Sequence, residues 1–283
     1  MLWYLFAFLT ALFESAKDVF SKKSLKETDE YVAAWALPAF ALPFLLPVLV
    51  LTGIPQLGAQ FWLALFTGGG LYAFTIILYM RALKSSDLSI TVPMLAFTPM
   101  FMLITSPLIV GEFPGVFGII GIFLIVLGSY LLNVSAKSQG YLAPFKALLK
   151  EKGPRLMLTV AFIWSITANI DKIGLQNSSP LFWVIAMDLF VVMLLLPLCW
   201  RKRAQIRANL GGLVKIGFFG GLTAISQMTA ISLTLVAYVI AIKRTSAIMG
   251  VLLGSAIFKE EGLSERLTGV VVMVVGVLFI TVF

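Results

Sequence analysis

Six charged side chains lie deep inside long apolar stretches of this sequence, where charge is costly. They are Glu14, Lys17, Asp18, Asp188, Lys243 and Arg244. Placing one such group at the centre of a lipid bilayer costs at least about 2.5 kcal/mol on insertion scales, so charges kept there usually serve a function. Carboxylate, ammonium and guanidinium groups can together bind polar molecules or carry protons. The six charges therefore predict a polar binding site inside an apolar protein.

The adjacent Lys243 and Arg244 are the best candidates for direct contact with a substrate. An ammonium group beside a fork-shaped guanidinium suits a phosphate or a carboxylate. The sequence contains an internal repeat, described below, and the matching positions in its first copy are Leu95 and Ala96. Symmetric helix packing therefore does not require these cations. The alternative is that the three cations of the set only neutralise its three acids.

Glu14 is a candidate functional residue because of its depth inside an apolar span. It lies eight residues before Lys22, roughly 12 Å from the end of its helix, at a depth similar to other charges of the set. Lys17 and Asp18 follow about one turn later on the same face. Structural ion pairing with Lys17 is therefore the alternative role of Glu14.

Aromatic and amide side chains in the corresponding apolar stretches complete the candidate site. Trp164 replaces Glu14 by repeat symmetry, and Asn169 follows five residues later. Each of these residues could instead only pack or cross-link helices, but together they indicate a polar cavity of moderate size. The predicted substrate-binding residues are Lys243, Arg244, Glu14, Asp188, Lys17, Asp18, Trp164, Asn169, Tyr72, Tyr79 and Gln227.

The residue types that the sequence lacks exclude most enzymatic chemistry. The chain has no histidine and only one cysteine, Cys199, which excludes an intrachain disulfide and a His/Cys metal site. The sequence also contains no nucleophile–base constellation and no glycine-rich nucleotide loop. We therefore expect neither an enzyme nor a bound cofactor or metal.

The elements that must position these residues are membrane-spanning helices. The chain has 283 residues, of which 60% are hydrophobic and 12% are charged, and its mean hydropathy is +1.02. Apolar runs near 20 residues are long enough to cross a bilayer. The expected fold is an all-α integral membrane protein with ten transmembrane helices. Their approximate ranges are 2–21, 31–52, 61–83, 88–110, 114–133, 155–175, 180–200, 211–233, 235–257 and 264–283.

The two halves of the sequence repeat one pattern at a constant offset of 148. Glu112, Gly121 and Gly128 recur as Glu260, Gly269 and Gly276. Five spans per copy are an odd number of crossings, so the second copy is inverted relative to the first. Inverted repeats are typical of alternating-access transporters, whose site lies at the midplane between the repeats. We expect a first repeat at 1–134, a linker at 135–154 and a second repeat at 155–283.

The two repeated glutamates have a structural explanation. Glu112 and Glu260 each precede a predicted helix start, which is marked by Pro114 in the first repeat and by Ser264 in the second. A carboxylate at that position complements the helix dipole. We therefore expect both glutamates to stabilise the helices that follow them.

The positive charges predict the orientation. Of the 21 Lys and Arg residues, 17 fall in the connections after the odd-numbered spans, one (Lys172) falls on the opposite side, and three lie inside spans. The positive-inside rule places those connections, including the linker, in the cytoplasm and both termini outside. The net charge of +8 is thus a topology signal, and we expect no nucleic-acid partner. The expected location is the inner membrane of a bacterial or archaeal cell.

Several of these residues resemble the C-terminal half of an EamA-type repeat, which defines the ten-helix members of the drug/metabolite transporter superfamily. In the first copy they are Arg81-Ala82-Leu83, Val92-Pro93, Thr98-Pro99, Gly111-Glu112, Gly121 and Leu127-Gly128, and in the second Gly254, Lys259-Glu260, Gly269 and Gly276. The resemblance implies a secondary transporter of small polar metabolites. It implies no particular substrate, because the superfamily carries amino acids, nucleotide sugars, phosphorylated sugars and cationic drugs.

Two branches of that superfamily suggest different substrates. Ile242-Lys243-Arg244-Thr245 is similar to the ninth helix of plastid phosphate translocators, where a Lys-Arg pair binds substrate phosphate. The spacing of Glu14 and Lys22 resembles the first helix of small multidrug-resistance transporters, where the Glu binds protons and cationic drugs in turn. This sequence departs from that pattern at Lys17 and Asp18.

Two transport hypotheses follow from these observations. The leading one is alternating-access transport, by a monomer, of a small metabolite with an anionic group or of a zwitterion. The alternative is proton-coupled export of amines or cationic drugs through Glu14 and Asp188. A non-transporting membrane receptor or an intramembrane enzyme is a remote third. A receptor does not need charges in the middle of inverted repeats, and the sequence lacks the histidines and the nucleophile–base constellation of an enzyme. The expected partners are thus the substrate and the lipid bilayer.

Overall fold

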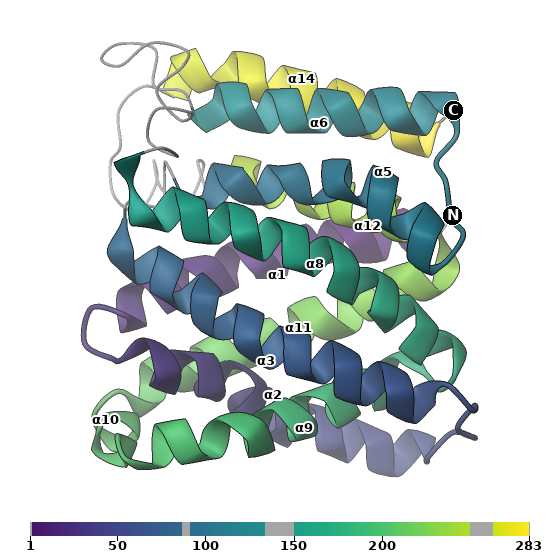
Figure 1. Ribbon diagram of the computed structural model, residues 1–283. Helices are drawn as coiled ribbons and strands as arrows, with labels where there is room; N and C mark the ends of the chain where they lie inside the picture. The colour runs from purple at the N-terminus through teal and green to yellow at the C-terminus, as the bar shows by residue number, and fades with distance from the viewer. Residues whose placement is uncertain (1, 87–90, 134–149, 250–262, 283) are drawn as a thin grey trace.

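The computed structural model describes residues 2–86, 91–133, 150–249 and 263–282, which fold almost entirely into helices (Figure 1). The first half contains α1 (Trp3–Ser24), α2 (Glu30–Thr52), α3 (Phe61–Ser85), a 3-10 helix η1 (Val92–Phe97), α5 (Thr98–Ile109) and α6 (Val116–Asn133). The second half contains α8 (Lys152–Gln176), α9 (Pro180–Trp200), the short α10 (Arg203–Ala208), α11 (Leu210–Leu233), α12 (Val236–Lys243) and α14 (Leu263–Thr281). Within these ranges, the ten longer α-helices confirm the predicted all-α fold.

Helix boundaries follow the predicted spans closely where capping residues mark them. α2, α3 and α9 each begin and end within two residues of the prediction. The Asp29 side chain accepts the N–H of Tyr31 at the start of α2, and Ser179 accepts that of Phe182 at the start of α9. In the described ranges, five helices are long and apolar enough to cross a membrane by themselves, namely α2, α3, α8, α9 and α11. α1 is equally long but carries several of the buried charges.

Helix contacts made by the first half recur with the two halves exchanged, as an approximate two-fold axis between them requires. α1 packs against α11 while its counterpart α8 packs against α3, and α5 packs against α8 while α12 packs against α1. α2 packs on its own counterpart α9, and α6 packs on α14. Figure 1 shows both chain ends at one end of the bundle, with α1 running away from that end and α8 running toward it. The two repeats are therefore inverted.

We call the end of the bundle that holds both chain ends the terminal end, and the opposite end the basic end. At the basic end the Ser86 hydroxyl, just after α3, accepts the N–H of Gly153 in α8 at 3.2 Å. Lys202, after α9, pairs there with Asp29 at 2.6 Å. Most of the predicted linker and the Lys259-Glu260 motif lie outside the described residues.

The repeated glycines mark a close backbone contact between the two repeats. A Cβ atom at Gly121 of α6 would lie 2.6 Å from the carbonyl oxygen of Gly276 in α14, and one at Gly276 would lie 2.7 Å from the carbonyl oxygen of Gly121. A Cβ at Gly128 would lie 2.7 Å from the carbonyl oxygen of Gly269. Small residues allow such backbone contact between membrane helices. The repeated motif is therefore a packing motif that joins one copy to the other.

The fourth and ninth predicted spans are interrupted at matching positions. The fourth contains η1 before α5 begins at Thr98, and the ninth ends its α12 segment at Lys243, turns at residues 244–245 and is helical again at 246–249. At the repeat offset of 148, the turn at 244–245 corresponds to residues 96–97 at the end of η1. Interrupted helices in corresponding places of two repeats are a common way to build a transporter site, because their free backbone groups and termini face a cavity.

Candidate substrate-binding cavity

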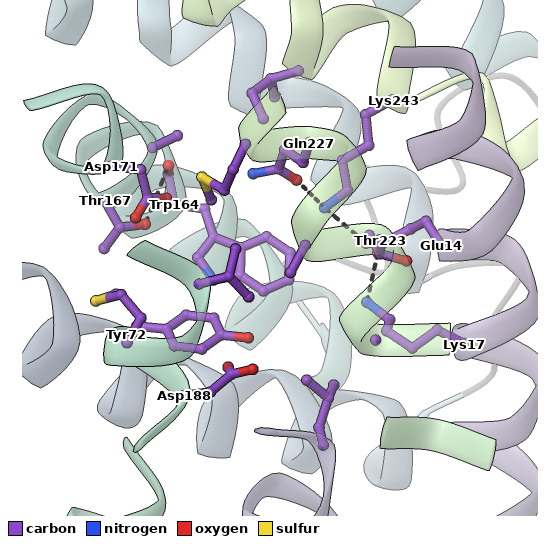
Figure 2. Close-up of a pocket in the computed structure, with 18 of the residues that line it drawn as sticks. Glu14, Lys17, Tyr72, Trp164, Thr167, Asp171, Asp188, Thr223, Gln227 and Lys243 are labelled. Atoms are coloured by element: carbon purple, nitrogen blue, oxygen red, sulfur yellow. Dashed lines mark hydrogen bonds and ion pairs between the residues drawn. The ribbon is translucent and has the colours of Figure 1, made fainter. Parts of the chain in front are cut away.

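A cavity of about 120 Å³ lies between the two repeats, near the middle of the helices that line it (Figure 2). Residues of α1, α2, α3, α5, α8, α9, α11 and α12 contribute to its walls. A single buried water needs only about 10–15 Å³, so the space is large enough for a small molecule. The helices of both halves therefore enclose one common site.

One wall of the cavity is formed by a network around Glu14. Lys17 Nζ lies 2.8 Å from one carboxylate oxygen of Glu14, and Lys243 Nζ lies 3.2 Å from the other. Lys17 also lies 3.3 Å from Asp18, and Lys243 donates to the amide oxygen of Gln227 at 2.8 Å. Glu14 belongs to the first repeat and Lys243 to the second. This network, which we call the lysine wall, therefore joins the repeats and places a lysine ammonium near each oxygen of Glu14.

Arg244 lies beside the lysine wall but takes no part in its ion pairs. Its Nη2 donates to the Thr98 hydroxyl at 3.1 Å, at the first residue of α5. Its Nε has no hydrogen-bond partner, and no described carboxylate lies within ion-pair distance of its guanidinium. The side chain is only 5% exposed and lines the cavity. Arg244 is therefore a buried cation with an N–H donor that has no partner.

The opposite wall is acidic. Asp171 of α8 accepts a hydrogen bond from the indole N–H of Trp183 at 2.9 Å. Asp188 of α9 lines the same cavity, and no described residue gives it a hydrogen bond or an ion pair. Figure 2 shows both carboxylates on the side of the cavity away from the lysine wall, with Tyr72 beside Asp188. We call Asp171 and Asp188 the acidic wall.

The sequence matches the model of the EamA-like transporter family twice, over residues 1–134 and over residues 152–282. The chain belongs to the EamA-like transporter family. Two EamA repeats therefore cover nearly the whole chain, and the protein is a multi-pass membrane transporter and not an enzyme. The cavity lies between the two EamA repeats, where alternating-access transporters with inverted repeats hold their substrates.

The fold is also found among solved structures. One, described only as the crystal structure of a protein, aligns with a TM-score of 0.73 at 14% sequence identity, over 98% of this chain and 96% of that chain. At this identity the similarity concerns the fold alone. No curated protein matches this EamA chain.

Most of the predicted site residues meet at the cavity, and three do not line it. Those that line it are Lys243, Arg244, Glu14, Asp188, Lys17, Trp164, Tyr72 and Gln227. Asp18 faces a smaller neighbouring cavity and accepts a hydrogen bond from Tyr79. Asn169 cross-links α8 to α5, because its amide donates to the Thr105 hydroxyl at 3.2 Å and to the Ser165 carbonyl at 2.6 Å. Tyr79 and Asn169 thus have the helix-linking roles that were the alternative in the sequence.

Asp171 is a charged lining residue that was not predicted from the sequence. It precedes Lys172 near the end of its span, where an adjacent acid and base suggest an ordinary polar helix end. A signal was nevertheless present, because Trp164, Thr167 and Asp171 are spaced by three and four residues and so share one helix face. All three line the cavity.

Glu112 stabilises a helix start, but not the one that was predicted. Its carboxylate accepts the N–H of Val236, the first residue of α12, at 3.1 Å, and pairs with Lys172 at 2.9 Å. The expectation that it serves the helix following it, α6, is therefore wrong. The connection between α5 and α6 carries Glu112 to the terminal end of the second repeat, where free N–H groups of α12 attract a carboxylate.

Proposed function

We propose that this EamA transporter moves a small polar metabolite with an acidic group by alternating access, and that the substrate binds in the central cavity. The observation that carries the proposal is the buried Arg244, which has an unpartnered Nε and no ion pair among the described residues. Arginine stays charged in proteins, and a buried charge without a partner is strongly unfavourable. A carboxylate or phosphate of the substrate would satisfy it with two parallel hydrogen bonds.

Arg244 is a better contact for such a group than Lys243. The ammonium of Lys243 is already engaged by Glu14 and Gln227, so a substrate would have to compete with both. The backbone turn at residues 244–245 and the start of α5 place Arg244 where the interrupted helices of the two repeats meet. A relative movement of the repeats would therefore carry this residue from one access path to the other. In this proposal the active unit is the monomer.

Uptake into liposomes tests the proposal. A thermal-shift screen of the purified protein against organic acids, phosphorylated metabolites and zwitterions selects ligands, since binding to the native state raises its stability. The selected compounds are then assayed for uptake per folded molecule with wild type, Arg244→Lys and the matched control Arg155→Lys, whose arginine is exposed on α8. Arg244→Lys should lose at least about 90% of uptake, because an ammonium lacks the bidentate fork. Full activity of Arg244→Lys would reject the proposal.

Proton-coupled export of amines or cationic drugs is the second candidate, and one observation favours it. Asp188 has no partner among the described residues, so it is free to bind a proton or a cation. Glu14 suits that role less well, because both of its oxygens already face lysine ammonium groups. If this candidate is right, amine uptake driven by a pH gradient should be lost in Asp188→Asn, and acids should not compete for uptake.

A further inference from the structure

We infer that Asp171 and Asp188 are a second binding pole of the cavity that holds a primary ammonium group, so the preferred substrate carries an amine and an acid at separated ends. This inference rests on the proposed function, since the acid end is the group assigned to Arg244. The two aspartates belong to α8 and α9, while Arg244 directly follows α12 and adjoins Lys243 of the lysine wall.

Asp188 is a buried carboxylate without a protein partner. The residue is 6% exposed, lines the cavity, and receives no hydrogen bond or ion pair from the described residues. Figure 2 shows its carboxylate directed toward the space beside Tyr72. A buried ionic group that lacks a partner is costly, so it is kept where something else completes it. Here that partner has to come from the ligand.

Asp171 presents a second carboxylate, held in a fixed orientation. One oxygen accepts the indole N–H of Trp183, and the other has no partner among the described residues. Trp183 is fully buried, and its ring packs on Gly174, where any Cβ atom would collide with it, and edge-on against Phe61. Trp183 is therefore a positioning residue that aims the free oxygen of Asp171 into the cavity.

The cations of the cavity are not available to neutralise the acidic wall. Lys17 is engaged by Glu14 and Asp18, and Lys243 by Glu14 and Gln227. None of the cations of the described residues lies within ion-pair distance of Asp171 or Asp188. The acidic wall thus presents carboxyl oxygens to the cavity without a protein cation, while Arg244, next to Lys243 of the lysine wall, has a donor without a partner.

A primary ammonium fits this wall better than a metal ion. It offers three N–H donors from one atom, so it can bond to the open oxygen of an aspartate and still donate to other polar groups of the cavity. No group of three or more acids, histidines or cysteines with metal-site geometry occurs in the described residues, whereas hard metal ions need several such oxygen ligands. The rings of Tyr72 and Trp164 line the space between the poles and offer faces to a cation and to its carbon chain.

The position of the poles on opposite walls determines the type of zwitterion. Figure 2 shows Asp171 and Asp188 on the side of the cavity away from Lys17 and Lys243, and Arg244 directly follows Lys243 in the chain. A molecule whose amine and acid share one carbon can reach only one pole at a time. A molecule whose charges are separated by several carbons can reach both.

Four six-carbon probes test this inference on the purified full chain. ε-Aminocaproate carries separated charges, norleucine carries adjacent ones, caproate lacks the amine, and hexylamine lacks the acid. ε-Aminocaproate should bind at least about tenfold more tightly than each of the others, as measured by thermal shift and by competition for uptake. Equal or tighter binding of caproate or norleucine would overturn the inference while leaving the proposed acid site intact. Failure of all four probes to bind would reject this substrate class.

Substitutions then test whether the acidic wall binds the ammonium group of the probe. Asp171→Asn and Asp188→Asn should each weaken ε-aminocaproate about tenfold or more and leave caproate affinity unchanged, whereas Arg244→Lys should weaken both compounds. Unchanged caproate affinity also shows that each aspartate variant is folded. Trp183→Phe removes the bond to Asp171 together with part of the buried ring, and it should weaken ε-aminocaproate while sparing caproate. Equal losses for both compounds in the aspartate variants would mean that the acidic wall is structural, and the inference would fall.

Discussion

Lys22 and Lys172 make the same pair of hydrogen bonds at opposite ends of the bundle. Each lysine lies near the end of the first helix of its repeat and donates from Nζ to carbonyl groups at the end of the third. The acceptors are Leu83 (2.6 Å) and Ser86 (3.1 Å) for Lys22, and Ile231 (3.0 Å) and Thr234 (2.6 Å) for Lys172. The last carbonyls of a helix lack partners within it, so each ammonium caps a neighbouring helix. At the terminal end, Lys172 also pairs with Glu112, which joins the two repeats.

The pair formed by Lys172 and Glu112 should be energetically coupled. Lys172→Met keeps much of the side-chain volume but removes the cap of α11 and the ion pair, so it should lower stability by about 1.5–3 kcal/mol. Glu112→Gln keeps an acceptor for the N–H of Val236 and should cost less than Glu112→Ala. Thermal unfolding of both single variants and of Lys172→Met/Glu112→Ala gives the coupling energy, expected at about 0.5–3 kcal/mol. If the stability losses of the two single variants simply add up to that of the double variant, the contact between Lys172 and Glu112 contributes nothing to stability.

The contact between Asp29 and Lys202 predicts a pH dependence at the basic end. Burial alone would raise the pKa of Asp29, but hydrogen bonds from Lys202 and from the Tyr31 N–H hold it below the usual 3.8. The hydrogen bond to Asp29 raises the pKa of Lys202 above its usual 10.5. The depressed pKa of Asp29 stabilises the fold above pH 3.8, and this contribution is lost as pH falls through the lowered value. The contribution of Lys202 is complete below pH 10.5 and is lost at higher pH.

Two substitutions of Asp29 separate its charge from its capping role. Asp29→Asn keeps the helix cap but loses the ion pair, so it should be slightly less stable than wild type at neutral pH and equal to it in strong acid. Asp29→Ala also loses the cap and should cost a further 0.5–2 kcal/mol or so at every pH. Unfolding curves measured across this pH range compare the three proteins. A stability gap between wild type and Asp29→Asn that persists in strong acid would contradict the assignment.

The crossing of α6 and α14 should not tolerate a side chain at its centre. Gly121→Ala would place a Cβ against the backbone of Gly276 and should destabilise the protein by about 1–3 kcal/mol. Gly70 in the middle of α3 is the matched control, because a Cβ there meets no atom within 4 Å. Gly70→Ala should be neutral or stabilising by up to about 1 kcal/mol. Similar melting temperatures for the two variants would show that the crossing can relax.

The orientation of the chain remains a prediction from charge, with the basic end in the cytoplasm and both termini outside. A fluorescent protein that folds only in the cytoplasm, fused after Phe283, should therefore stay dark. The same reporter inserted between Lys202 and Arg203, at the basic end, should fluoresce. A bright C-terminal fusion would reverse the assignment of the two ends without affecting the fold.

The sequence predicted the helices well because their apolar spans, cap residues and repeated glycines are local signals. It also predicted most of the cavity, since a charge retained in an apolar helix has to face the interior. Depth alone, however, does not fix the direction in which a side chain points. Tyr79 and Asn169 have the expected depth but are rotated toward neighbouring helices. Asp171 was missed because its adjacent lysine made the position resemble a helix end, while in the structure the two side chains point to different partners.

The glycine contact between α6 and α14 has a consequence for how the polypeptide is made. Each half ends in a helix whose surface is complementary to the last helix of the other half. Each half also carries its own basic residues for insertion in its own orientation, such as Arg81 and Lys84 in the first and Lys202 and Arg203 in the second. Recognition between the halves is thus built into their helices. Two separately synthesised fragments, residues 1–134 and 152–283, should therefore associate in the bilayer through the surfaces of α6 and α14.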